Sequence, residues 1–196
     1  MKTLKFAGTV LCAALLLAGC GKESSNPAES AKTAAKAPVT TAAIEAEAKG
    51  FTVGPTMSAR TVYVFFDPQC PHCAVLWQSA KPLKSQAKFV WIPVGLIGDT
   101  SVGQGATILA AADPIAKMEE NESSVLAKSG GISASGNIDA QKEAVKKNTA
   151  LFNRFGFEAV PTIVALHAQT GALVTNEGSL PTADLAAKLG LQPPSQ

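Results

Sequence analysis

The residues best suited to chemistry are two cysteines three positions apart, within the tetrapeptide Cys70-Pro71-His72-Cys73. Disulfide exchange needs one thiolate that attacks and a second thiol close enough to displace it. We expect a helix to begin near Cys70, where unpaired backbone N–H groups and the helix dipole favour an anion. The spacing therefore predicts Cys70 as the nucleophile and Cys73, one turn further in, as the resolving thiol.

His72 lies between the two thiols and is a third candidate for the site. When protonated, its imidazole would place a positive charge beside Cys70 and lower the pKa of that thiol further. We therefore predict that the Cys70 thiolate is well populated at neutral pH. A low pKa also makes this sulfur a good leaving group, so the disulfide form should be a competent oxidant. The alternative, an inert surface histidine, stays open.

Metal binding and structural roles are weaker explanations of the cysteine pair. Two cysteines at this spacing make half of a zinc site, but His72 is badly placed to complete it and His167 fits a structural role better. A structural disulfide would close too short a loop to stabilise much. Three methionines and two histidines are too few for a copper-handling protein. We expect no metal, and no cofactor besides the redox-active Cys70–Cys73 disulfide.

Hydrophobic periodicity predicts the elements that position the pair. A continuous apolar run over residues 61–66 predicts a buried strand that ends before Asp67. Apolar residues then recur every three or four positions up to Ala87, which predicts a helix that Pro82 should kink. Residues 89–92 predict a second buried strand.

The second half of the chain predicts a helical insertion, then a hairpin and a closing helix. The insertion, residues 101–156, should hold helices over 106–112, from Asp113-Pro114 onward and over 139–155, with a Gly- and Ser-rich loop at 129–137. The hairpin and the last helix should cover residues 162–166, 172–175 and 181–189. Strands alternating with helices imply an α/β fold, and the hairpin makes its sheet mixed.

Residues 64–73, Val-Phe-Phe-Asp-Pro-Gln-Cys-Pro-His-Cys, resemble the active-site segment of the bacterial disulfide-bond (Dsb) proteins of the thioredoxin superfamily. The chain is most similar to the DsbC/DsbG catalytic domain, over about residues 62–189, including Ile-Leu-Ala-Ala-Ala-Asp-Pro at 108–114, Phe155-Gly156 and Val160-Pro161-Thr162. The resemblance implies a thioredoxin fold with a helical insertion between the second strand and the cis-proline strand. It also implies thiol:disulfide oxidoreductase activity.

The resemblance assigns a role to Pro161 that spacing alone does not. From spacing, Val160-Pro161-Thr162 is a strand start, and a trans proline stays open because few X–Pro bonds are cis. By resemblance, Pro161 is the cis-proline beside Cys70, and the Val160 backbone pairs with a substrate chain. Many thioredoxin-like proteins place a buried carboxylate six residues before the nucleophile. Val64 stands there, and Asp67 is not assigned that role.

The resemblance further implies a periplasmic protein with exported, cysteine-containing substrates and a membrane redox partner of the DsbB or DsbD type. Pro71-His72 and Val160 are similar to the oxidant DsbA, which favours an oxidase. Only about 40 residues separate Cys20 from the first strand, so we expect no DsbC/DsbG-type dimerisation domain and a monomer. The alternatives are a DsbC/DsbG-like isomerase or reductase, and a non-catalytic, chaperone-like lipoprotein that uses the groove around Pro161.

The first 20 residues have the pattern of an export signal. Two lysines precede an apolar stretch over 6–19, too short to span a membrane, and Leu-Ala-Gly-Cys at 17–20 resembles a bacterial lipobox. We predict a signal peptide over 1–19, a lipidated Cys20 with a flexible tether over 20–50, and a catalytic domain over 51–196. Gly21 favours the outer membrane. An ordinary secretory signal with a chance cysteine is the alternative.

Charge excludes one class of partner. The chain has 17 basic and 15 acidic side chains, and without Lys2 and Lys5 both counts are 15. No basic stripe is present to bind phosphates, so we expect no nucleic-acid partner. Membrane attachment should depend on lipid rather than on a polybasic surface.

Overall fold

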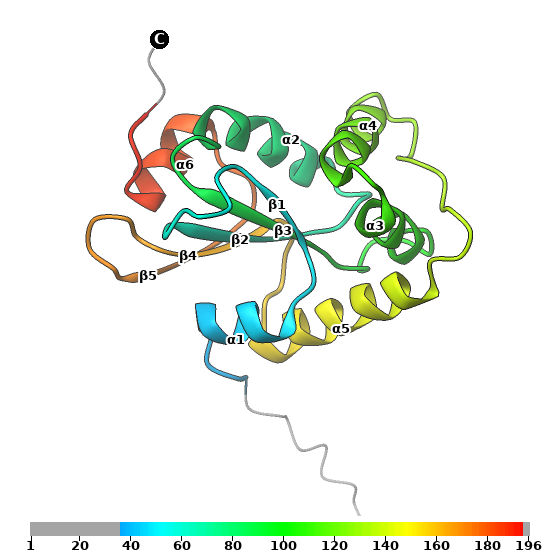
Figure 1. The fold of residues 1–196 in the computed structure, drawn as a ribbon, viewed down its shortest axis with the longest axis horizontal. Coiled ribbons are helices and arrows are strands. Elements are labelled where there is room, and N and C mark those ends of the chain that lie inside the picture. Colours follow the sequence, from blue (N-terminus) through cyan, green and yellow to red (C-terminus); the bar gives the residue numbers. More distant parts are fainter. Residues whose placement is uncertain (1–35, 194–196) are drawn as a thin grey trace, which may run out of the picture. The chain divides into compact units, whose positions relative to one another are not determined.

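The computed structural model describes residues 36–193, which form a five-stranded sheet covered by helices on both faces (Figure 1). The strand order is β1-β3-β2-β4-β5. The predicted signal peptide over 1–19, the lipidation site Cys20 and the tether up to residue 35 lie outside the described residues. No helix within 36–193 is long and apolar enough to cross a membrane.

The centre of the sheet is the strand that leads to the cysteine pair. β2 (Thr61–Phe66) runs parallel to β3 (Lys88–Pro93) and antiparallel to β4 (Thr162–Leu166). The edges are β1 (Phe51–Val53), antiparallel to β3, and β5 (Leu173–Glu177), antiparallel to β4. Five consecutive residues of β2 are buried because helices cover both faces, as its continuous apolar run predicts.

Alternate side chains of β2 belong to two separate cores. Val62, Val64 and Phe66 pack in the core under α2 (Pro71–Ala80) and α6 (Thr182–Leu189). The side chains between them face α1 (Thr41–Glu47) and α5 (Asp139–Phe155) on the opposite face, and these are Tyr63 and Phe65. This alternation follows from the two-residue period of a strand.

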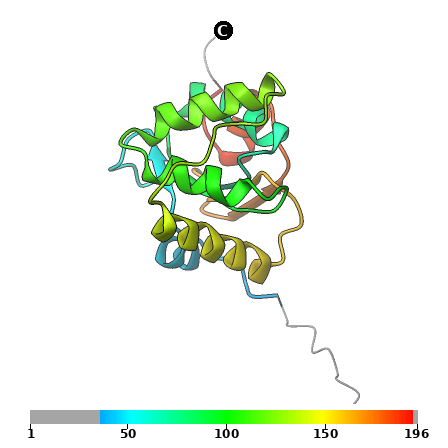
Figure 2. The same ribbon diagram turned by 90° about the vertical axis from the view of Figure 1, so that its right-hand side faces the viewer.

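Three helices between β3 and β4 form the predicted insertion. They are α3 (Ser101–Ala110), α4 (Pro114–Leu126) and α5, and Figure 2 shows α4, α3 and α5 stacked in that order. The Asp113 carboxylate caps α4 by accepting the Ala116 N–H at 3.0 Å, and α5 ends at Gly156 with φ 72°. The prediction of an α/β fold with a helical insertion is confirmed.

Several predicted boundaries are wrong. The helix α2 ends at Ala80, and Pro82 lies in a separate 3₁₀ turn, η1 (Lys81–Leu83), rather than inside a kinked helix. A proline lacks the N–H that the α-helical ladder needs and clashes with the carbonyl four residues earlier. The helix α3 begins five residues before its predicted start, β5 is shifted towards the C-terminus, and β1 was not predicted.

The predicted tether is wrong for residues 36–50, which belong to the folded domain. Ile44 of α1 is fully buried against the core beneath α5. The Lys49 N–H donates to Asn148 Oδ1 at 2.9 Å, and Asn148 Nδ2 donates to the Lys49 carbonyl at 2.7 Å. Composition suggested a tether because one isoleucine among alanines shows no periodicity, and its burial depends on a helix about 100 residues away.

Candidate active site

The cysteine pair lies at the junction of β2 and α2. The Cys70 N–H donates to the Asp67 carbonyl at 3.0 Å, which turns the chain out of the strand. Cys70 is the N-cap of α2, and its carbonyl accepts the Cys73 N–H at 3.0 Å. Both cysteines are free thiols, and the structure confirms the predicted helix start.

The two thiols differ strongly in acidity. A hydrogen bond from the Cys73 thiol lowers the pKa of Cys70 to about 7, with further help from the backbone amides of Cys73 and His72 against the effect of burial. Cys73 is fully buried, and burial together with the charge of Cys70 raises its pKa well above the ordinary value. At neutral pH about half of the Cys70 thiol is therefore ionised, while Cys73 keeps its proton.

His72 contributes to this site through its backbone. Its side chain is exposed on the first turn of α2, and its N–H is one of the groups that lower the Cys70 pKa. The causes of that shift do not include the imidazole. A role for the His72 side chain remains a prediction.

The segment before β4 meets the cysteine pair, as the resemblance implies. The Val160–Pro161 peptide bond is cis, and Cys70 Sγ lies 3.5 Å from the Val160 carbonyl oxygen, which accepts the thiol hydrogen. Pro161 is buried and Val160 is half-buried. The structure thus brings together two segments 90 residues apart, and substrate binding at Val160 remains a prediction.

Asp67 is a buried carboxylate whose positioning role the sequence did not reveal. Its side chain accepts hydrogen bonds from Gln69 N–H, Ser101 Oγ–H, Leu96 N–H and Ile97 N–H at 2.9, 2.7, 2.7 and 2.9 Å. Four donors compensate for the burial of this group. Asp67 therefore fixes the turn before Cys70 to the loop after β3 and to the start of α3.

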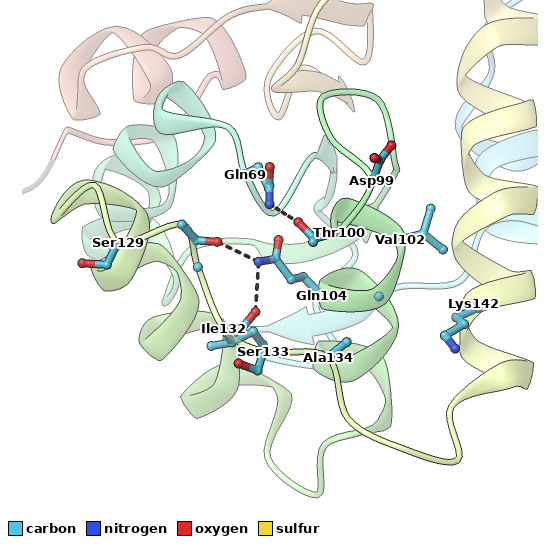
Figure 3. A pocket seen from close by; sticks show the side chains of 13 residues that line it. Gln69, Asp99, Thr100, Val102, Gln104, Ser129, Ile132, Ser133, Ala134 and Lys142 are labelled. Carbon is cyan, nitrogen blue, oxygen red and sulfur yellow. Dashed lines mark hydrogen bonds between the residues drawn. The ribbon is translucent and has the colours of Figure 1, made fainter.

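A second polar cluster joins the insertion to the same turn. Asn121 Nδ2 donates to the Pro68 carbonyl at 2.8 Å, and Asn121 Oδ1 accepts the Ile132 N–H at 3.1 Å. Gln104 Nε2 donates to the carbonyls of Gly130 and Ile132 at 2.8 and 2.9 Å (Figure 3). Two buried amides thus hold the 129–134 loop against α3 and α4, and one of them reaches the residue two positions before Cys70.

A polar cavity of about 720 Å³ lies beside this cluster. Gln69, Thr100, Gln104 and Lys142 line it together with the 129–134 loop, and the Gln69 amide bonds the Thr100 hydroxyl at its rim (Figure 3). Gln69 adjoins Cys70, so the cavity opens close to the thiols. Within residues 36–193, no three His, Cys, Asp or Glu side chains gather closely enough to hold a metal ion.

Glu122 is a further buried polar group that the sequence did not single out. The residue is fully buried on α4, and Asn121 Nδ2 donates to its Oε1 at 3.3 Å. Burial, the largest cause, and the negative charges of nearby groups raise the pKa of Glu122 to about 9. A sequence signal for this burial exists, because Glu122 follows Met118 by four residues and precedes Val125 by three, which places it on the apolar face of α4.

Comparison with known proteins gives one family and several relatives. The family described as "Thioredoxin-like domain" matches residues 54–192. "Thiol:disulfide interchange protein DsbG" of Pseudomonas aeruginosa is 31% identical over 134 residues, which cover 67% of this chain and 51% of that protein. The Escherichia coli protein of the same name is 32% identical over 108 residues, 52% of this chain and 42% of that protein. The chain thus spans about half the length of these relatives.

Solved structures share the fold at low sequence identity. The thiol-disulfide exchange protein alpha-DsbA2 from Wolbachia pipientis matches with a TM-score of 0.58 and 17% identity, covering 72% of this chain and 86% of that one. A periplasmic thioredoxin-like protein from Salmonella enterica matches with a TM-score of 0.55 and 17% identity, covering 72% and 88%. These likenesses support the architecture described above.

Proposed function

Since this chain belongs to the thioredoxin-like domain family, we propose that it is a thiol:disulfide oxidoreductase of the bacterial Dsb type. The observation that carries the proposal is the unequal acidity of the two thiols at one helix start. A nucleophile with a pKa of about 7 reacts as a thiolate at neutral pH. A buried partner that keeps its proton does not compete for the substrate, and it stays one helical turn away.

The thiol pair can run exchange in both directions. In oxidation, a substrate thiolate attacks Cys70 of the disulfide, and Cys73 leaves with the bonding electrons and takes up a proton. A second substrate thiolate then attacks the substrate sulfur of the mixed disulfide, and Cys70 leaves as a thiolate. The substrate loses two electrons and gains a disulfide, while the pair is reduced. Reduction of a substrate is the reverse sequence.

We favour the oxidising direction. The preference depends on Pro71-His72 and Val160, which are similar to the oxidant DsbA. The lowered Cys70 pKa also stabilises the thiolate of the reduced form, but a value of about 7 is that of thioredoxin and does not decide the direction. A DsbG-like isomerase or reductase is the second candidate, supported by identity of 31% and 32% to two proteins named DsbG. The two candidates share Cys70 and Cys73, and they differ in redox potential.

The proposal also covers the substrates of this protein, its redox partner and its location in the cell. Exported, cysteine-containing proteins would bind beside Cys70 with their backbone along Val160, whose carbonyl lies 3.5 Å from the sulfur. A membrane protein of the DsbB or DsbD type would reset the pair. The leader-like residues before Cys20 support export, lipidation and attachment on the periplasmic side of a membrane, with the outer membrane favoured.

Equilibration with glutathione at several ratios would measure the redox potential of the pair. A potential nearer to about −120 mV, the DsbA value, would support the oxidase, and one near the thioredoxin value of about −270 mV would exclude it. In parallel, oxidised protein should transfer its disulfide to a reduced, unfolded secretory protein. Cys70→Ala should abolish this transfer. Absence of transfer by the natural chain, together with equal suppression of aggregation of an unfolded protein by the natural chain and by Cys70→Ala, would favour the chaperone-like alternative.

Lipidation can be tested separately in a bacterial host. The full chain should incorporate labelled fatty acid and fractionate with membranes, whereas Cys20→Ala should do neither. Alkylation of intact cells before lysis would show the resting redox state of Cys70 and Cys73. A pair found mostly as disulfide supports the oxidase, and one found mostly as dithiol supports the isomerase or reductase.

A further inference from the structure

One carboxylate oxygen in the core has no use in the chemistry described so far. Among residues 36–193, Glu122 Oε2 is buried and has no hydrogen bond with another protein group, while Oε1 has the 3.3 Å contact with Asn121. A buried polar atom without a partner costs stability, and such exceptions in native proteins often have a redox or catalytic function. The position of this residue suggests which function.

Glu122 lies within electrostatic reach of both thiols. It belongs to α4, which packs against α2, and its charge is one of the causes that raise the pKa of Cys73. The charge of Cys70 is in turn one of the causes that raise the pKa of Glu122. Asn121, the neighbour in sequence, is bonded to the Pro68 carbonyl just before the cysteine turn, so this part of α4 is anchored at the site.

We propose that Glu122 is the proton-transfer residue of this enzyme, giving a proton to Cys73 when the disulfide opens and taking it back when the disulfide forms. The proposal presupposes the thiol exchange proposed above and adds the group that handles its proton. Cys73 is fully buried, so water has poor access to its sulfur. A buried acid is therefore the more direct source and acceptor of the proton.

The step balances when the enzyme reduces a substrate. In the mixed disulfide between Cys70 and a substrate, the Glu122 carboxylate removes the proton from Cys73. The Cys73 sulfur then attacks Cys70 and forms the intramolecular disulfide, and the bond from Cys70 to the substrate breaks. The substrate leaves as a thiolate with the electron pair. In the oxidising direction, protonated Glu122 neutralises Cys73 as it leaves.

The surrounding charges couple this proton to the redox state. The ionisable groups that act on Glu122 are Cys70, Asp67 and, on its own helix, Glu119. Helix α3 and strand β1, which also pack against α4, contain no ionisable side chain. Cys70 is negative only as a free thiolate, so a mixed disulfide removes one of the charges that hold the proton on Glu122. The carboxyl group thus becomes a better base when Cys73 must lose its proton.

The other acidic residue at the site does not fit this task. Four donors already occupy the Asp67 carboxylate, and a group so fully bonded has little capacity to exchange protons with a thiol. The position six residues before Cys70 holds Val64, whose side chain packs in the core. Glu122 acts electrostatically on the thiol pair from the helical insertion instead.

The test measures the reaction rates of Cys70 and Cys73 separately in the full chain. The reduced protein is mixed with a symmetric aromatic disulfide that releases one coloured thiolate when Cys70 attacks and a second when Cys73 resolves. In Glu122→Gln, which keeps the size of the side chain and the bond from Asn121, the second release should slow about 100-fold at neutral pH. The first release should change by less than about twofold, because Cys70 performs it.

The pH profile separates proton transfer from a structural effect. In the natural chain, the rate of the second release should level off below pH 9, once Glu122 is ionised in the mixed disulfide. In Glu122→Gln it should keep rising by about tenfold per pH unit, because hydroxide must then remove the proton. An unchanged second release with an unchanged profile would overturn the role of Glu122.

Glu120→Gln is the matched control on the same helix. Glu120 is exposed, bonds Lys117 of α4 and is not among the groups that shift the pKa of Glu122, so its replacement should leave both releases within about twofold of the natural chain. A slowing equal to that of Glu122→Gln would contradict a specific role for Glu122. Absence of the first release in the natural chain would instead contradict the proposed function itself.

A measurement on the natural chain covers the case in which Glu122→Gln does not fold. Infrared difference spectra between reduced and oxidised protein should contain the band of a protonated carboxyl group. That band should disappear at a lower pH in the oxidised protein, because the Cys70 charge is then absent. A band that titrates identically in both redox states would overturn the proposal.

Discussion

The β2–α2 turn and the helical insertion approach the same two sulfur atoms but contribute in different ways. In the turn, Cys70 and Cys73 lie on one helical turn, and neighbouring backbone groups lower the Cys70 pKa. In the insertion, the relevant groups are buried polar side chains, Gln104, Asn121 and Glu122, more than 30 residues further along the chain. The turn supplies the reacting atoms, and the insertion supplies their support and a buried acid.

The acidity of the nucleophile and the geometry of the site are therefore separable in this protein. A helix start with two cysteines is sufficient for an acidic thiol, because the amides involved are close in sequence. The position of that helix start depends on Asp67 and Asn121, which join it to the loop after β3 and to α4. Substitutions in the two regions should therefore produce different kinds of defect.

The largest effect should come from the turn. Cys70→Ser should reduce disulfide transfer to a reduced protein by at least about 10³-fold, since a serine hydroxyl is not ionised at neutral pH and cannot form the mixed disulfide. In the Cys73→Ser variant, Cys70 should still attack a substrate disulfide. Because no resolving thiol is present, the mixed disulfide should accumulate and be detectable by mass spectrometry. Comparable transfer by Cys70→Ser would show that the turn does not supply the reacting atom.

A large stability effect is expected from the insertion. Asn121→Ala should lower the free energy of unfolding by about 2–3 kcal/mol, because it leaves the Pro68 carbonyl and the Ile132 N–H buried without partners. Denaturant titration of the reduced protein measures this loss. Asn153→Ala, at an exposed position on α5, should change stability by less than about 0.5 kcal/mol. Equal changes in the free energy of unfolding for the two variants would contradict the structural role assigned to Asn121 in the insertion.

The pH dependence of stability should have opposite signs in the two regions. The Cys70 pKa is lowered from 9.0 to about 7, so the unfolded chain binds more protons between these values and stability of the reduced protein should rise with pH. The Glu122 pKa is raised from 4.5 to about 9, so its contribution is complete below 4.5 and is lost as pH rises through 9.

Two variants separate these opposing contributions. Denaturant titration between pH 7 and 9 should show stability falling with pH in Cys70→Ser, where Glu122 acts alone, and rising in Glu122→Gln, where Cys70 acts alone. Each slope should be at most about 1.4 kcal/mol per pH unit. Slopes of the same sign in both variants would contradict the assignment of either group.

The smallest effect should come from the His72 side chain. Thiolate absorbance of reduced protein should titrate with a midpoint near the pKa of about 7, and His72→Ala should move it by less than about 0.5 unit, since the contribution comes from the backbone N–H. A shift of a full unit would restore the sequence-based prediction that the imidazole lowers the Cys70 pKa.

Sequence patterns predicted the elements whose signals are local. The buried run of β2, the Asp113 cap of α4 and the Gly156 end of α5 all lie at or close to their predicted positions. The packing of Ile44 was not predictable, because it depends on a surface from a distant segment. The spacing of Glu122 to Met118 and Val125 indicates its helix face, but the segments that cover this face are distant in the sequence. Pro82 was placed in the wrong element because its local signal fits both a kink and a helix end.

Local patterns identify the reactive pair and most of the strands and helices, because cysteine spacing, hydrophobic period and helix caps act over a few residues. The resemblance of residues 64–73 to the Dsb active-site segment indicates the family. Three features depend on the folded chain: Val160 meets Cys70, Asp67 accepts four hydrogen bonds, and Glu122 is buried on a helix packed against α2, where its charge acts on Cys73. These contacts join segments tens of residues apart. They form because packing around one sheet brings distant segments of the chain together, and patterns over a few residues do not indicate such contacts.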